Sequence, residues 1–244
     1  LLDEVVAALP EPAEEPEYPE DALRVAIIGR PNVGKSSITN RFAGKNRSIV
    51  SDVAGTTRDA LDVIVERGDK RYRLVDTAGM RKRNLVHEDV EYYSLVRGLR
   101  AIDEADVCLL VVDASEGVTE QDQKVAGLAI ERGCALVILL NKWDLVRTDE
   151  KREDVMMSVA RRMTFAPWAP VIRVSALTGR SLDKVWAVVD RVGAAHASKI
   201  STNALNNLLA SMRESGHTVT KGAKRLRIQY ANQTGNCPPA LTFF

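Results

Sequence analysis

One eight-residue segment, Gly29 to Ser36, constrains the fold of this 244-residue chain more than any other. It reads Gly-Arg-Pro-Asn-Val-Gly-Lys-Ser, which fits the G-x-x-x-x-G-K-[ST] pattern of a phosphate-binding loop. Such a loop follows a buried strand and opens a helix, and the apolar run Leu23–Ile28 supplies the strand. The two glycines let backbone N–H groups point inward at phosphate oxygens, and the helix dipole favours a bound anion. The segment therefore predicts a nucleoside triphosphate site.

Each side chain of this loop predicts a particular contact. Lys35 brings a positive charge to the β- and γ-phosphates, and the Ser36 hydroxyl is a ligand for Mg²⁺. We expect the nucleotide to bind at Gly29, Asn32, Val33, Gly34, Lys35, Ser36 and Ser37.

Strand and helix patterns alternate from Leu23 to Ala195. The runs Val107–Val112 and 135–140 are continuously apolar, as in parallel strands that are covered on both faces. The segments 59–66 and 70–76, joined by Arg67-Gly68-Asp69, have the signature of a hairpin. Further expected elements are helices near 35–44, 88–102, 119–132, 149–163 and 181–195, and a strand at 171–174. The alternation predicts an α/β fold with a mostly parallel sheet and one antiparallel strand.

Three later motifs follow predicted strands, at the carboxyl edge where such sheets bind ligands. Asp76-Thr77-Ala78-Gly79 offers a carboxylate that reaches Mg²⁺ through water and the Gly79 N–H for the γ-phosphate. Asn141-Lys142-Trp143-Asp144 offers a carboxylate that accepts hydrogen bonds from guanine N1–H and N2–H₂, which adenine does not present there. Ser175-Ala176-Leu177 offers a backbone N–H to guanine O6. Together with the phosphate loop, these motifs predict guanine nucleotide binding and GTP hydrolysis.

Both ends of the chain differ in composition from the middle. Residues 1–20 carry seven acids, no Lys or Arg, and four prolines, which is typical of an extended linker; Leu1–Leu9 looks like the tail of a preceding domain. Residues 196–244 carry six basic residues against one acid, which favours a polyanionic partner such as RNA. A helix near 203–214 and strands at 225–230 and 241–244 predict a small α+β module there. We therefore expect a linker at 1–20, a G domain at 21–195 and a partial module at 196–244.

The remaining features favour a cytoplasmic location. The three cysteines have no C-x-x-C spacing, so neither zinc nor a redox pair is indicated. No apolar run approaches the ~20 residues of a membrane span, and no signal peptide is recognisable. The three histidines form no ligand pattern, and we expect the three tryptophans to be packing residues.

The phosphate loop together with Ala54-Gly55-Thr56-Thr57-Arg58-Asp59 resembles the bacterial Era/TrmE-like GTPases. Asp76 to Arg83 and Val90 to Ser94 look like the second G domain of the Der (EngA) family. That family comprises ribosome-assembly GTPases with two tandem G domains and a C-terminal KH-like domain. The resemblance implies a Ras-like G domain followed by a truncated KH-like module. It also implies that an upstream G domain is absent from this chain, and that the large ribosomal subunit and its rRNA are partners.

The resemblance further assigns roles by position. Thr57 would bind Mg²⁺ with Ser36 and Asp76, and loop 46–58 would be switch I, which γ-phosphate and Mg²⁺ order. Met80 stands where Ras-like GTPases carry a glutamine that orients water, so Glu91 or Glu88 is the expected substitute. The predicted catalytic residues are Lys35, Thr57, Gly79 and Glu91. Asn32 resembles the asparagine of potassium-stimulated members, and the Ser51 and Val53 carbonyls would complete a K⁺ site.

Two alternatives remain open at this stage. The chain is either a GTPase of large-subunit assembly or the GTPase component of a tRNA-modification system, although the basic module and acidic linker favour the first. Because Met80 cannot position water, a GTP-gated binding module with negligible turnover is also possible. No G-x-x-G of the kind that clamps RNA in KH domains occurs between His196 and Phe244. Any RNA contact would therefore rely on phosphate charge from basic residues, namely Lys221, Lys224, Arg225 and Arg227.

Overall fold

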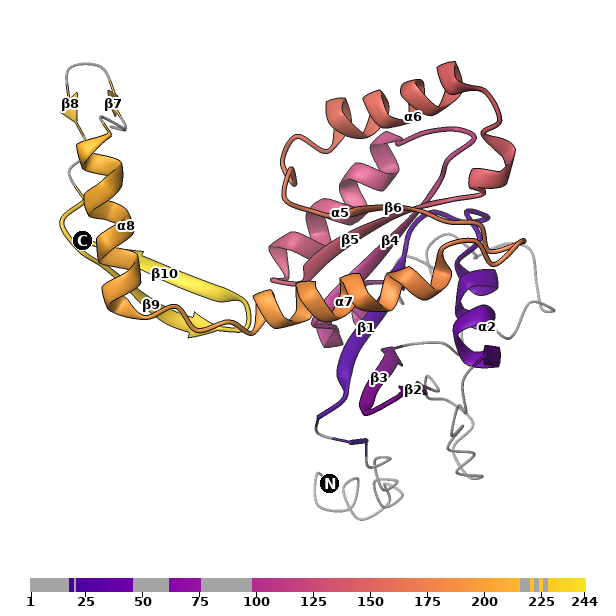
Figure 1. Ribbon diagram of the computed structural model, residues 1–244, viewed down its shortest axis with the longest axis horizontal. Coiled ribbons are helices and arrows are strands. Elements are labelled where there is room, and N and C mark those ends of the chain that lie inside the picture. Colours follow the sequence, from indigo (N-terminus) through magenta and orange to yellow (C-terminus); the bar gives the residue numbers. More distant parts are fainter. Residues whose placement is uncertain are drawn as a thin grey trace, which may run out of the picture.

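A computed structural model describes residues 18–19, 21–45, 62–75, 98–215, 220–221, 224–225 and 228–244. Its centre is a six-stranded sheet in the order β2-β3-β1-β4-β5-β6 (Figure 1). The strands are β1 (Leu23–Ile28), β2 (Val63–Arg67), β3 (Lys70–Val75), β4 (Val107–Asp113), β5 (Ala135–Asn141) and β6 (Val171–Arg173). Only β2 runs antiparallel, paired with β3, while the other neighbours are parallel. This confirms the predicted sheet.

Helices cover both faces of this sheet (Figure 1). On one face, α5 (Glu120–Glu131) and α6 (Asp149–Arg162) enclose a core with the buried residues of β4 and β5 that point to that side. On the other, α2 (Lys35–Lys45) and α7 (Leu182–His196) enclose a second core. Every residue of β4 and β5 is buried, which explains why both strands read as continuous apolar runs.

Local sequence signals explain where several elements begin. At the start of α5, the Thr119 side chain accepts from the Asp122 N–H, and the Asp122 carboxylate accepts from the Thr119 N–H, which makes a capping box. The Thr148 side chain caps α6 in a similar way by accepting from the Lys151 N–H. Helix 98–104 is the described part of the helix expected near 88–102, and the rest of that range lies outside the described residues. The predicted linker, apart from residues 18–19, also lies outside them.

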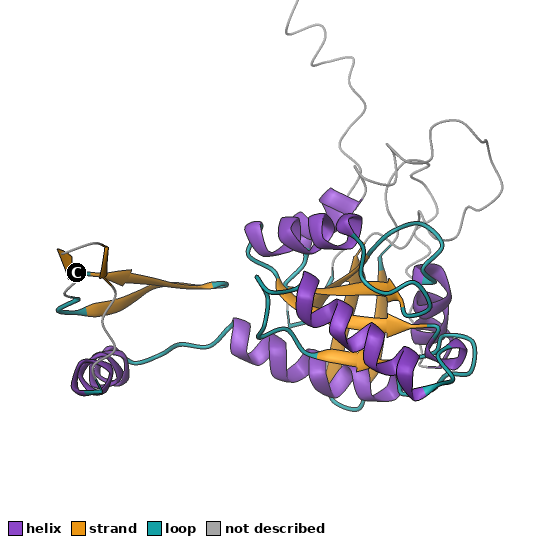
Figure 2. Ribbon diagram, turned by 90° about the horizontal axis from the view of Figure 1, so that it is seen from above, coloured by secondary structure: helices purple, strands orange, loops and turns teal. Residues whose placement is uncertain are grey.

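The C-terminal segment forms a smaller unit in which α8 (Thr202–Glu214) packs on a hairpin of β9 (Ala231–Asn236) and β10 (Pro239–Phe243) (Figure 2). A two-residue pair, β7 (Thr220–Lys221) and β8 (Lys224–Arg225), is separate from that hairpin. The strand expected at 225–230 is wrong at 228–230, which are not in a strand, and the hairpin strand begins at Ala231. Arg225 belongs to β8, and 226–227 lie outside the described residues. The β9 sequence Ala-Asn-Gln-Thr-Gly-Asn lacks apolar alternation, so only its pairing with β10 defines it.

This unit meets the sheet at the edge opposite the predicted site. Gly133 lies just before β5, and its carbonyl is 2.7 Å from Nε2 of His196 at the end of α7. The Pro238 ring lies against the same glycine, where an added Cβ would be 2.8 Å from Pro238 Cδ. Since parallel strands end at the other edge, the C-terminal unit leaves the loops that follow β1, β4 and β5 uncovered.

Two expectations about side chains have mixed outcomes. Trp143 and Trp186 are buried in the two cores, but Trp168 is 55% exposed, so its assignment as a packing residue is wrong. Cys108 and Cys134 are buried, Cys237 is exposed, and all three are free thiols. Among the described residues, no helix is long and apolar enough to cross a membrane.

Candidate functional site

The phosphate loop follows β1 and has a backbone that only glycine tolerates at two points. Gly29 has φ +138° and Gly34 has φ +101°. A Cβ at Gly29 would lie 2.4 Å from the Val111 carbonyl oxygen, and one at Gly34 would lie 2.2 Å from Asn141 Nδ2. Asn32 also has positive φ, at 61°. The loop therefore takes the tight turn that the motif predicts.

Lys35 turns its amino group back onto the loop. Nζ donates to the Gly29 carbonyl oxygen at 2.8 Å and to that of Arg30 at 2.6 Å. Burial lowers the pKa of Lys35 to about 8, and the charge of Asp122 opposes that shift. The first turn of α2 has no acidic residue, and it contains the predicted ligands Ser36 and Ser37. The loop and the helix start thus present positive charge and N–H dipoles, with no acidic residue in the first turn of α2.

Arg30 ties the phosphate loop to the start of α5. Its Nε donates to Asp122 Oδ1 at 3.1 Å, and its Nη2 donates to Glu116 Oε2 at 2.9 Å. The Asp122 side chain is fully buried, where it also completes the capping box with Thr119. No local sequence pattern predicts this anchor, because its partners are about 90 residues apart.

Asn141 joins the phosphate loop to the loop after β6. Its side chain is buried, with Nδ2 donating to the Val33 carbonyl oxygen at 2.8 Å and Oδ1 accepting from the Ala176 N–H at 2.9 Å. Within the same loop, Ser175 Oγ donates to Asp144 Oδ1 at 2.5 Å. The structure therefore brings Val33, Asn141, Asp144, Ser175 and Ala176 together at the carboxyl edge of the sheet.

Lys142 is held by an acid that lies outside the predicted motifs. It has φ 60°, and its Nζ lies 2.5 Å from Asp113 Oδ2 at the end of β4. Burial alone would raise the pKa of Asp113, but hydrogen bonds from Lys142 and Ser115 lower it below its usual value. An acid at the end of a fully buried strand was the available signal. Asp113 therefore stays ionised and fixes Lys142 beside the predicted base site.

Several predicted site residues lie outside the described residues, so their placement is not part of this geometry. They are Ser51, Val53, Thr57, Asp76, Gly79, Met80, Glu88 and Glu91. Among the described residues, no group of three or more His, Cys, Asp and Glu side chains is arranged to hold a metal ion. Among the predicted Mg²⁺ ligands, the described one is Ser36 at the start of α2, whose hydroxyl suits Mg²⁺ that also binds phosphate oxygens.

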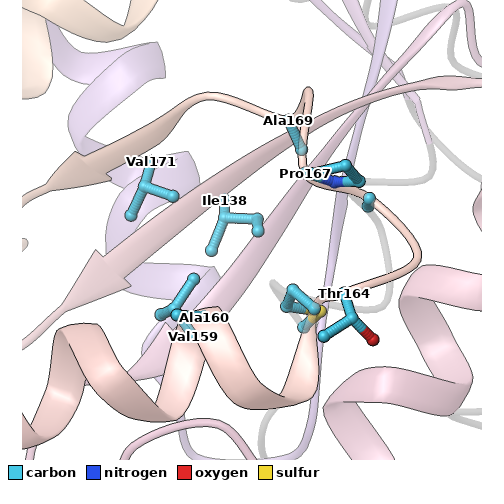
Figure 3. A pocket seen from close by; sticks show the side chains of 9 residues that line it. Ile138, Val159, Ala160, Thr164, Pro167, Ala169 and Val171 are labelled. Atoms are coloured by element: carbon cyan, nitrogen blue, oxygen red, sulfur yellow. The ribbon is translucent and has the colours of Figure 1, made fainter.

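A hollow of about 430 Å³ lies elsewhere, between α6, β5 and the segment that leads to β6 (Figure 3). Its walls include Ile138, Val159 and Val171, and Thr164 carries the only hydroxyl among its lining side chains. It has no charged group to bind phosphate. The hollow is therefore separate from the phosphate loop and the base site.

A phosphate loop after the first strand and an Asn-Lys-x-Asp segment after a later one define a P-loop guanine-nucleotide-binding domain. Residues 24–142 match the family described as 50S ribosome-binding GTPase, and residues 199–244 match the KH-domain-like C-terminal region of EngA bacterial GTPase enzymes. The chain belongs to the Der (EngA) family of GTPases.

Relatives with similar sequences match this chain over its whole length. GTPase Der of Heliobacterium modesticaldum is 51% identical over 245 residues, which cover 100% of this chain and 55% of that protein. GTPase Der of Symbiobacterium thermophilum is 47% identical, covering 100% of this chain and 52% of the relative. The chain thus spans about half the length of these relatives.

Solved structures support the fold. The crystal structure of Era in complex with MgGDPNP and a segment of 16S ribosomal RNA has a TM-score of 0.54 at 24% identity, over 70% of this chain and 57% of that one. Elongation factor SelB from Methanococcus maripaludis, with a GTP analogue, has a TM-score of 0.55 at 18% identity, over 74% of this chain and 35% of that one.

Proposed function

We propose that this chain binds GTP and hydrolyses it to GDP and phosphate, as a switch in assembly of the large ribosomal subunit. One observation carries the nucleotide part: Asn141 bonds at once to the phosphate loop and to the loop that holds Asp144 through Ser175. A carboxylate fixed in this way accepts two donors of guanine, and a site built around it rejects bases that lack them.

At the phosphate end, the Lys35 ammonium would leave its two loop carbonyls or share them with phosphate oxygens. Its charge then stabilises the negative charge that develops on the γ-phosphate and the leaving GDP. Ser36, Thr57 and Asp76 would hold Mg²⁺, which neutralises phosphate charge when bound. Gly79 would donate its N–H to the γ-phosphate, and the attacking water would be positioned by Glu91, because Met80 cannot do so.

Potassium is the second proposed cofactor. Asn32 has positive φ within the phosphate loop and is exposed, so its side-chain oxygen is available to a cation beside the phosphates. Ser51 and Val53 carbonyls would complete the site. Potassium would then supply charge that an arginine brings in other GTPases.

The ribosomal role rests on the family. The relatives are GTPase Der proteins of bacteria, the matching G-domain family is described as 50S ribosome-binding, and the C-terminal segment is KH-like. We propose a linker at 1–20, a G domain at 21–195 and a KH-like module at 196–244. The relatives' greater length is consistent with an upstream G domain as a partner. These roles belong in the cytoplasm, where ribosomes assemble.

Cosedimentation tests this proposal. The chain is centrifuged with separated ribosomal subunits in GTP, GDP or no nucleotide, and phosphate release is measured in parallel. We expect association with the large subunit that depends on the nucleotide, and release of phosphate from GTP. Hydrolysis without subunit binding in any nucleotide state would leave a GTPase and overturn the ribosomal role.

A further inference from the structure

Arg41, six residues after the phosphate-loop lysine, reaches the loop that would contact the guanine base. It lies on α2, half-buried, and its Nε donates to the Ala176 carbonyl oxygen at 3.0 Å. Its Nη2 donates to the carbonyl oxygen of the next residue, Leu177. A Cβ at Gly179 would lie 3.6 Å from Nη1, so the guanidinium also borders that end of the loop. One planar side chain therefore bridges two successive carbonyls.

The loop has little else to hold its outer part. Ser175 is buried, and its Oγ accepts from the Thr178 N–H at 3.1 Å while the Gly179 N–H donates to the Ser175 carbonyl oxygen at 2.8 Å. Leu177, in contrast, is 76% exposed, so apolar packing does not fix its position. The Arg41 hydrogen bonds are the contacts that bind the Ala176 and Leu177 carbonyls to the body of the domain.

The geometry of the peptide bond makes this contact relevant to the base. In a planar trans peptide, C=O and N–H point in opposite directions, so fixing the Ala176 carbonyl also fixes the Leu177 N–H on the other side. On the other side of Ala176, its N–H is held by Asn141 Oδ1. A charged donor on the Ala176 carbonyl polarises the peptide and makes its N–H a better donor.

Arg41 also connects two ends of the site. Its helix begins at Lys35. Two apolar side chains of the same helix, Ile38 before Arg41 and Phe42 after it, are buried in the core. The backbone that carries Arg41 is therefore fixed relative to the phosphate loop. We propose that Arg41 is a positioning residue for recognition of guanine O6. It holds loop 175–179 so that the N–H groups of this loop face the guanine base of a nucleotide whose phosphates lie at the start of α2.

This inference rests on the proposed GTP site, and base analogues separate the two. GDP and inosine diphosphate both carry O6, whereas 2-aminopurine riboside diphosphate lacks it. For Arg41→Ala, we expect affinity for GDP and inosine diphosphate to fall by the same factor, about tenfold. Affinity for the 2-aminopurine analogue should stay within about twofold of the native value. Arg41→Lys keeps the charge but lacks the planar fork of the guanidinium, so it should give a smaller loss for the same two nucleotides.

The matched control is Asn40→Ala, an exposed neighbour on the same helix, which should leave all affinities unchanged. Melting temperatures of all variants identify any general loss of folding, and Arg41→Lys carries the test if Arg41→Ala does not fold. Unchanged GDP affinity, or an equal loss for the analogue that lacks O6, would overturn the positioning role. Failure of the native protein to prefer GDP over ADP would instead overturn the proposed function.

Discussion

The part of the site around Asp144, the base end, and the part around Lys35, the phosphate end, differ in their hydrogen-bond partners. At the base end, Asn141, Asp144, Ser175 and Ala176 are already joined by hydrogen bonds of 2.5 to 2.9 Å. At the phosphate end, Lys35 satisfies its amino group with carbonyls of its own loop, and burial depresses its pKa. The base end is therefore joined by hydrogen bonds within the protein, while we expect the phosphate end to gain interactions with a bound anion.

Asp144→Asn tests the base end with the largest expected effect. The amide offers a donor where guanine also donates, but xanthine has a carbonyl at that position. We expect the ratio of GTP to xanthosine triphosphate affinity to change by up to ~10⁴-fold. Direct binding titrations measure it, with Asp149→Asn, an exposed acid on α6, as the matched control. Persistent preference for GTP would show that Asp144 does not read the base.

Lys35→Ala tests the phosphate end. Loss of a charge that acts on the transferred phosphate should lower GTP turnover by about 10² to 10³-fold. The preference for GDP over inosine diphosphate should be unchanged, since the Lys35 amino group bonds to Gly29 and Arg30 of the phosphate loop and not to the base loop. Phosphate release under saturating GTP measures the turnover, and Lys151→Ala on α6 is the control. If the preference between the two bases changed as well, the two ends would not be independent.

The pH dependence of GDP affinity tests the pKa of Lys35. Bound phosphate favours the ammonium, so its pKa rises on binding, and the empty protein loses that proton above a pH of about 8. Affinity should thus be constant below a pH of about 7 and fall by up to about tenfold between pH 7.5 and 9. Lys35→Met has no such proton, so any pH dependence of its GDP affinity reports the titration of guanine itself and is subtracted from the native profile. A native profile that parallels this variant would contradict the assignment.

Arg30→Met has the smallest expected effect. It removes the anchor between the phosphate loop and α5, and part of that contact faces solvent through Glu116. We expect GDP affinity to fall about threefold, with base preference intact. Arg152→Met, at an exposed ion pair on α6, is the control. A changed base preference would mean that the loop anchor also positions the base end.

Much of this arrangement could be predicted because local patterns determine it. The apolar runs of β4 and β5 and the phosphate-loop glycines each carry their own signal. Asp113 and Arg41 act through contacts that the fold creates, and Arg41 is 135 residues from Ala176, so no local pattern indicates it. The strand at 231–236 was missed because its polar sequence depends on β10. Trp168 was misassigned, since aromatic character alone does not determine burial.

The central claim is that the hydrogen-bonded group of Asn141, Asp144 and Ser175 selects guanine. Calorimetric titration of the native, nucleotide-free chain with GDP and with ADP in Mg²⁺ tests it most directly. We predict that GDP binds at least about 10³-fold more tightly than ADP. Affinities within tenfold of each other would contradict the account, because the hydrogen bonds that join Asn141, Asp144 and Ser175 would then not select the base.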